Sequence, residues 1–204
     1  MSKNCRVLVG VLVALAVVSL SACGKAPQAA VDQAQAALAA AGEAEAANYA
    51  PQAWEAAQGA VNAAMAEVEA QNAKFALTRS YKRASELLTA AQQAAVEAKD
   101  AAVSGKEQMR VAVEGAVATI EENLSAADGL LKTLATCRKR PKGFAGDLEI
   151  MRGNVDGLRS QLGEVQAEAA EGNFFQADSM AKSLLEGLDA VVTDLKNAKA
   201  KLGC

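Results

Sequence analysis

The chain has 204 residues, of which 51% are hydrophobic and only 3% aromatic, and alanine alone accounts for about a quarter of them. Its 24 acidic and 21 basic residues give a net charge of −3 at pH 7, and it contains no histidine. These values exclude Ser-His-Asp catalysis and histidine metal sites, and they give no basis for nucleic-acid binding. The alanine content and the scarcity of β-branched residues after the N-terminal segment predict an all-α fold.

Residues 1–22 have the pattern of a bacterial lipoprotein signal peptide. A short basic start precedes an apolar run of about 14 residues, which is shorter than the roughly 20 that a membrane-spanning helix needs. The run ends in Leu20-Ser21-Ala22-Cys23, which resembles a lipobox. The resemblance implies that the Cys23 thiol is acylated and that cleavage makes Cys23 the first mature residue. A plain signal peptide with an accidental cysteine is the alternative.

Lipidation at Cys23 predicts attachment to a membrane, because two or more acyl chains hold a protein firmly where one gives reversible binding. By resemblance to enterobacterial sorting rules, Gly24 after the cysteine implies the periplasmic face of the outer membrane, with the inner membrane as the alternative. Residues 23–30, which include Pro27, are expected to form a short lipidated tether. The body of the protein should therefore lie close to the membrane surface.

Residues 31–104 are predicted to form an Ala-rich array of three helices. The first covers residues 31–47 and is interrupted before Pro51, a residue that is well tolerated in the first turn of the next helix. The second and third helices carry apolar side chains at Trp54, Ala57, Val61, Ala64 and Val68, and at Tyr81, Ala84, Leu88, Ala91, Ala95, Ala98 and Ala102. Because most of these side chains are single methyl groups, this half should bury little area and be the less stable one.

Three short segments of this half resemble a known family. They are Ala37–Ala44, Tyr49-Ala50-Pro51 with Trp54, and Ser80–Ala84. They resemble an uncharacterised family of bacterial envelope lipoproteins, domain of unknown function 4398, over roughly residues 26–103. The resemblance implies short Ala-rich helical hairpins, which in some members stand beside peptidoglycan-binding domains. No such wall-binding module is recognisable downstream, so the resemblance does not imply wall binding.

Residues 105–204 are predicted to form a coiled-coil-like bundle of three antiparallel helices, because apolar residues recur in steps of three and four. The breaks fall at 141–146 and 172–173. The three seams are Val113, Val117, Ile120, Leu124, Ala127, Leu131 and Leu134; Leu148, Met151, Val155, Leu158, Leu162, Val165 and Ala169; and Phe174, Ala177, Ala181, Leu184, Leu188, Val191, Leu195, Ala198 and Leu202.

The connection between the two halves is predicted to be a single long helix that passes through Ser104 and Gly105. Glycine costs about 1 kcal/mol in a helix interior, but the residues from Lys106 to Val117 are strongly helical. The expected fold is therefore an elongated antiparallel helical bundle, in which the long helix joins the Ala-rich array to the heptad bundle. Two independent domains separated near Gly105 are the alternative.

The cysteines provide a further expectation. Cleavage would remove Cys5 with the signal peptide, and Cys23 would carry the lipid. Cys137 and Cys204 then remain as the two cysteines exposed to an oxidising periplasm. Antiparallel helices would place both at the same end of the C-terminal bundle, so a disulfide is expected. Closing a loop of that length should stabilise the fold by about 4 kcal/mol. Two free thiols are the alternative.

Two surface features are candidates for binding. Four basic residues lie beside Phe144 in the connection between the first and second helices of the C-terminal bundle: Arg138, Lys139, Arg140 and Lys142. They could meet an anionic polymer or an acidic partner, or could simply form a soluble loop that complements the end of a helix dipole. The second feature is the pair Tyr49 and Trp54, which could be a contact point or a plug at the end of the Ala-rich bundle.

The sequence therefore predicts a membrane-anchored lipoprotein of the cell envelope that faces the periplasm and acts as a structural or protein-interaction module. Its expected partners are the membrane, through the lipid on Cys23, and other envelope proteins or the cell wall. No enzymatic activity, cofactor, metal, nucleic acid or small-molecule substrate is expected. A helical carrier or chaperone that holds an amphipathic ligand is the alternative.

Overall fold

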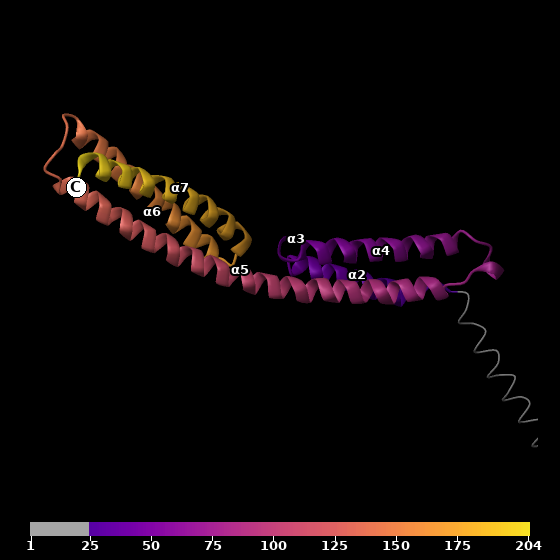
Figure 1. The fold of residues 1–204 in the computed structure, drawn as a ribbon. Coiled ribbons are helices and arrows are strands. Elements are labelled where there is room, and N and C mark those ends of the chain that lie inside the picture. The colour runs from indigo at the N-terminus through magenta and orange to yellow at the C-terminus, as the bar shows by residue number, and fades with distance from the viewer. Residues whose placement is uncertain (1–24) are drawn as a thin grey trace, which may run out of the picture. The chain divides into compact units, whose positions relative to one another are not determined.

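The computed structural model describes residues 25–204, so Cys5, Cys23 and the expected signal peptide lie outside the described residues. Within these residues, six α-helices and one short 3-10 helix follow one another (Figure 1). They are α2 (Gln28–Glu43), α3 (Ala46–Tyr49), α4 (Pro51–Asn72), η1 (Ala76–Thr78), α5 (Lys82–Thr136), α6 (Phe144–Ala170) and α7 (Phe174–Leu202). Residues 25–204 contain no strand, and the predicted all-α fold is confirmed.

Helix α5 is continuous over its 55 residues and takes part in both compact units of the chain. Unit 1 extends to Ser104, and unit 2 begins at Gly105. The predicted long helix is thus confirmed, and Gly105 does not interrupt it. No helix within residues 25–204 is both long and apolar enough to cross a membrane.

Unit 1 is formed by α2, α3, α4 and the first part of α5, and its core consists of two groups of small side chains. One group mixes valine and alanine with Tyr81 and Leu88; the other, which we call the alanine cluster, contains only alanines among its fully buried members. The alanine cluster is Ala41, Ala46, Ala57, Ala95, Ala98 and Ala102. The predicted apolar positions of α4 and α5 from Ala57 onward are all buried, so the spacing identified this core correctly.

The start of unit 1 differs from the prediction at both ends of its first helix. Helix α2 begins at Gln28 rather than Val31, directly after Pro27, which shortens the expected tether. The helix also ends at Glu43 instead of continuing to Ala47, because Glu45 adopts a left-handed backbone with φ of 58°. That conformation costs a non-glycine residue roughly 1–2 kcal/mol. The following short helix α3 offsets part of this cost by burying Ala46 completely in the alanine cluster.

Unit 2 is formed by the second part of α5 with α6 and α7, and it has one continuous core. Each seam position predicted from the heptads is either buried in this core or packed against it. Leu188, Leu195 and Ile120 have no exposed surface, so this core contains large side chains where unit 1 has mainly alanine. Polar contacts between α5 and α6 add to it, because Arg159 donates to both carboxylate oxygens of Asp128 at 2.9 and 3.1 Å. This pair is exposed and therefore contributes at most about 1 kcal/mol.

Candidate functional site

The disulfide end of unit 2 brings together most of the candidate residues. Cys137 directly follows α5 and Cys204 follows the C-terminal end of α7, and the two are joined by a disulfide with their Cα atoms 5.8 Å apart. Gly203 ends α7 in a left-handed conformation, with φ of 68°, that glycine adopts without strain. The antiparallel arrangement thus brings the two cysteines to one end, as the sequence predicts.

The basic residues of the α5–α6 connection are exposed at this end. Arg138, Lys139, Arg140 and Lys142 all lie on the surface, and no carboxylate within residues 25–204 is at ion-pair distance from any of them. We call these four residues the basic loop. Their charges are therefore available to an anion, and their exposure is equally consistent with a solvated loop at the end of a helix dipole.

Phe144 does not belong to the exposed surface of the basic loop, and the prediction that groups it there is wrong. It is the first residue of α6, only 6% exposed, and it packs in the core of unit 2. The preceding Gly143 has a positive φ of 94°, which turns the chain so that the ring faces inward. The loop consequently offers charge without an aromatic side chain.

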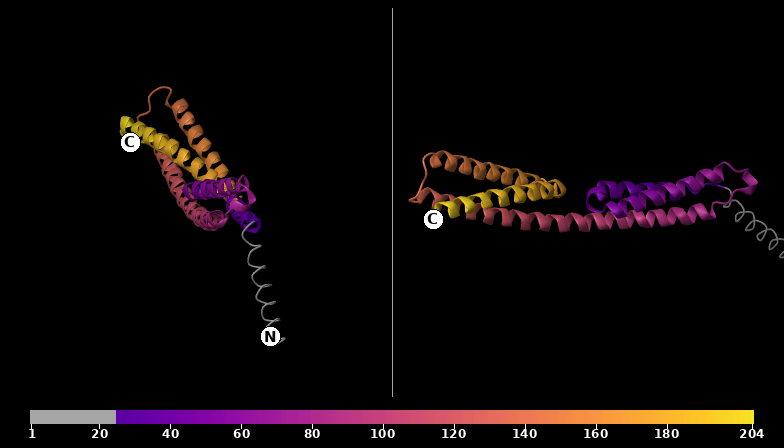
Figure 2. Two further views of the ribbon diagram at one scale, coloured as in Figure 1. Left: turned by 90° about the vertical axis from the view of Figure 1, so that its right-hand side faces the viewer. Right: turned by 45° about the horizontal axis from the view of Figure 1, so that its top comes forward.

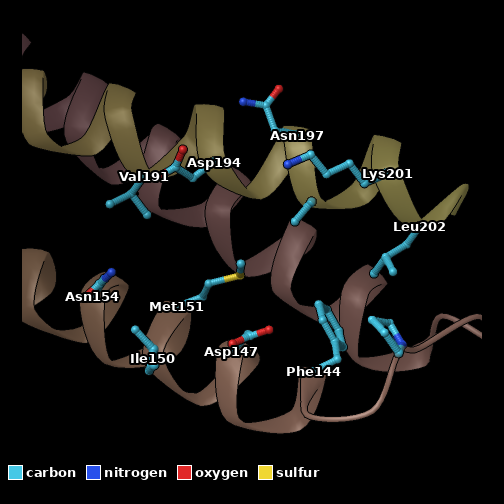
Figure 3. A pocket seen from close by; sticks show the side chains of 12 residues that line it. Phe144, Asp147, Ile150, Met151, Asn154, Val191, Asp194, Asn197, Lys201 and Leu202 are labelled. Atoms are coloured by element: carbon cyan, nitrogen blue, oxygen red, sulfur yellow. The ribbon is translucent and has the colours of Figure 1, made fainter.

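A cleft of about 570 Å³ lies between α6 and α7 near this end, a feature that the sequence did not indicate (Figure 3). Its apolar lining includes Phe144, Met151 and Leu202, and its polar lining includes Asp147 and Lys201. In Figure 3 side chains from the two helices face one another across the opening. Met151 and Leu202 are seam positions that are only partly buried, so the two helices leave room for an apolar group at this end.

Tyr49 is the last residue of α3 and Trp54 lies in the first turn of α4, and both pack partly buried against the alanine cluster. A Cβ atom at Gly42 would lie 3.5 Å from the Trp54 ring, which is ordinary van der Waals contact, so the indole covers the end of α2. The Trp54 indole thus fills space that alanine methyl groups leave open. This packing favours the plug over the contact point.

Replacing Trp54 by alanine should lower the free energy of unfolding of unit 1 by about 2 kcal/mol, since the ring is partly buried against a core that cannot close around the gap. Thermal unfolding followed by circular dichroism at 222 nm measures the change. Gln58→Ala, at an exposed position of the same helix, is the matched control. An unchanged melting temperature in Trp54→Ala would instead indicate a contact point.

Neighbouring charged side chains on the surface of α5 shift the pKa values of two groups, Glu107 and Arg110. On α5, hydrogen bonds from Arg110 lower the pKa of the exposed Glu107 carboxyl, and Glu107 and Glu114 together raise the pKa of Arg110. These pairs are separated by three and four residues, the spacing at which side chains on one helix meet. Among residues 25–204, no three Cys, Asp or Glu side chains gather in a way that could hold a metal ion.

Comparison of the chain with family models, with curated proteins and with solved structures found no match. The resemblance of residues 26–103 to domain of unknown function 4398 therefore stays a prediction. The candidate site is defined by the geometry of unit 2 itself: the basic loop, the disulfide and the cleft between α6 and α7.

Proposed function

We propose that this protein is a lipoprotein anchored by Cys23 to the periplasmic face of the outer membrane, where it acts as a structural or protein-interaction module of the cell envelope. The observation that carries the proposal is the lipobox-like Leu20-Ser21-Ala22-Cys23 after a short apolar run. Acylation there would supply the membrane anchor, and the helical units would supply the surface that other molecules meet.

The short distance from Cys23 to the first helix supports a role close to the membrane. Only residues 24–27 separate Cys23 from the start of α2 at Gln28. A fully extended chain covers at most about 3.5 Å per residue, so the lipid and the helix would be no more than about 18 Å apart. Unit 1 would therefore stay near the bilayer, and a partner of unit 1 would have to bind close to the membrane surface.

Two features of unit 2 support an interaction role in an oxidising compartment. The disulfide between Cys137 and Cys204 is a bond that persists in the periplasm and is rare in the cytosol. The basic loop beside it presents four exposed cationic side chains in a chain that is acidic overall. Charge of that kind favours a partner with an acidic surface or an anionic polymer.

Lipidation is tested by growing cells with an alkyne-bearing fatty acid and detecting the label on the protein. The wild-type protein should be labelled and sediment with membranes, because the acyl chains hold it there. Cys23→Ala should lose the label and leave the membrane fraction, whereas Cys137→Ala should retain both properties. A density gradient then separates outer from inner membrane, and an unlabelled wild-type protein would contradict the anchor.

The interaction role predicts a partner that depends on the basic loop. Formaldehyde crosslinking in intact cells should recover the partner with the wild-type protein, and changing Arg138, Lys139, Arg140 and Lys142 to glutamine should reduce its yield severalfold. The matched control changes four exposed basic residues elsewhere in unit 2 to glutamine, namely Lys132, Arg152, Lys182 and Lys196. Equal recovery with both variants would exclude the loop as the contact.

The cleft between α6 and α7 favours a second candidate, a carrier that holds an amphipathic ligand. Its apolar lining could receive an acyl or aromatic group, and Asp147 and Lys201 could orient a polar end. Recovery of a bound amphiphile by native mass spectrometry of the purified protein would support this candidate over the structural role.

A further inference from the structure

The loop between α4 and α5, residues 73–81, is held in one conformation by its own hydrogen bonds. Arg79 donates from Nε to the Lys74 carbonyl oxygen at 2.8 Å and from Nη2 to that of Asn72 at 2.9 Å. The Tyr81 hydroxyl donates to the side-chain oxygen of Asn72 at 2.5 Å. These contacts occupy carbonyl groups at the end of α4 and attach the loop to the start of α5. The loop is therefore an ordered structure.

This ordered loop exposes two large apolar side chains. Phe75 is 72% exposed and Leu77 is 88% exposed, and they are the two most exposed of the large hydrophobic residues within 25–204. Leu77 lies in the 3-10 helix η1 and Phe75 directly precedes it, and the Thr78 hydroxyl donates to the Phe75 carbonyl oxygen at 2.9 Å. Apolar side chains that an ordered loop turns outward together indicate a surface that something else covers.

Four basic residues stand in the same segment of the chain as this apolar pair. The segment 70–85 contains Lys74, Arg79, Lys82 and Arg83 and no acidic residue, although the whole chain carries a net charge of −3. The side chains of Lys82 and Arg83 are 86% and 77% exposed. Each forms a long ion pair, Lys82 with Glu86 at 4.0 Å and Arg83 with Glu67 at 3.9 Å. An exposed apolar pair in a basic segment matches the surface of an anionic bilayer, where acyl chains lie beneath phosphate groups.

The same end of unit 1 receives the start of the described chain. Helix α2 begins at the end of the unit where α4 ends and α5 begins (Figures 1 and 2). Ala26 packs against the core group that contains Val68 of α4 and Tyr81, the last residue of the loop. If Cys23 carries lipid, as in the proposed function, that lipid and the loop would meet the same membrane.

We infer that the α4–α5 loop is a membrane-contact site: Phe75 and Leu77 insert at the boundary between headgroups and acyl chains of an anionic bilayer, and the basic residues of the same segment bind its phosphate groups. The site supplies a second attachment point beside the lipid on Cys23. Two separate attachment points would restrict the orientation of unit 1 on the membrane, which a single flexible anchor does not do.

The test uses the mature chain with Cys23→Ser, so that no acyl chain contributes, and vesicles of phosphatidylcholine with or without phosphatidylglycerol. Co-sedimentation should show binding that requires the anionic lipid and weakens as salt is added. The double variant Phe75→Ser/Leu77→Ser should bind about tenfold more weakly because both insertions are lost. Lys82→Gln/Arg83→Gln should reduce binding roughly fivefold for each charge removed.

The matched control is Val96→Ser/Val103→Ser, which removes two exposed apolar side chains from α5 in the same unit and should leave binding unchanged. Because Phe75 and Leu77 are exposed, their replacement should preserve the circular dichroism spectrum. Equal binding of wild type and Phe75→Ser/Leu77→Ser would overturn the inference. So would self-association of the wild type that this double variant abolishes, because the occupant would then be a second copy of the chain.

The vesicle experiment tests the loop site and the lipidation experiment tests the anchor, and each can contradict its own hypothesis without affecting the other. Anionic-vesicle binding that depends on Phe75 and Leu77 supports the site even where the fatty-acid label on Cys23 is absent. A labelled Cys23 with no vesicle binding by the unlipidated chain removes the loop site and leaves the proposed anchor intact.

Discussion

Replacing both Cys137 and Cys204 by alanine is expected to lower the free energy of unfolding of unit 2 by about 4 kcal/mol and its melting temperature by roughly 20 °C. The disulfide joins residues 67 positions apart, so it closes a long loop in the unfolded chain and reduces the conformational entropy gained on unfolding. Unit 2 extends from Gly105 to Cys204, so the closed loop contains about two thirds of its residues.

Circular dichroism at 222 nm, recorded with and without reductant, measures this effect. Reductant should destabilise the wild-type protein by a similar amount and leave the double alanine variant unchanged. Fluorescence gives a control within the same molecule, because Trp54 is the single tryptophan and lies in unit 1. The fluorescence transition should therefore shift much less than the dichroism. Rapid alkylation of both thiols in the native, unreduced protein would contradict the disulfide.

The core of unit 2 could be predicted from the sequence because its seams consist of large aliphatic residues among polar ones. Val113, Val155 and Leu188 each stand in a series with steps of three and four, and each is at most 1% exposed. A period of this kind indicates amphipathic helices that pack against one another, and the short connections between them favour an antiparallel solution. The same solution brings Cys137 and Cys204 together.

The ends of the helices in unit 1 could not be predicted with the same accuracy. In an Ala-rich segment nearly every residue favours a helix, so the local sequence contains no signal for a break at Glu45. Glycine or asparagine would normally mark a left-handed residue, and glutamate does not. The break follows from tertiary packing, because it allows Ala46 to enter the alanine cluster.

The candidate sites show what spacing reveals and what it does not. Phe144 stands four residues before Leu148, which stands three residues before Met151. The apolar spacing of α6 therefore extends back to Phe144 and indicates that it is a core residue, as the structure shows. The cleft between α6 and α7 depends on how far two seams separate at one end, which no spacing reports. Likewise, Phe75 and Leu77 lie in a loop in which Arg79 donates hydrogen bonds to two backbone carbonyl groups, and these contacts cannot be read from the spacing of apolar residues.

Leu188→Ala is expected to lower the free energy of unfolding of unit 2 by about 3 kcal/mol, because Leu188 has no exposed surface and packed neighbours on all three helices cannot close the cavity. Urea unfolding followed by circular dichroism measures the loss. Ile150→Ala is the matched control, since Ile150 is 65% exposed and its truncation should change stability by less than about 0.5 kcal/mol. Equal losses in the two variants would contradict the heptad core.

The alanine cluster of unit 1 offers no comparable truncation, because its buried side chains are already single methyl groups. The stability of the chain should therefore be concentrated in unit 2, leaving unit 1 as the part that unfolds first.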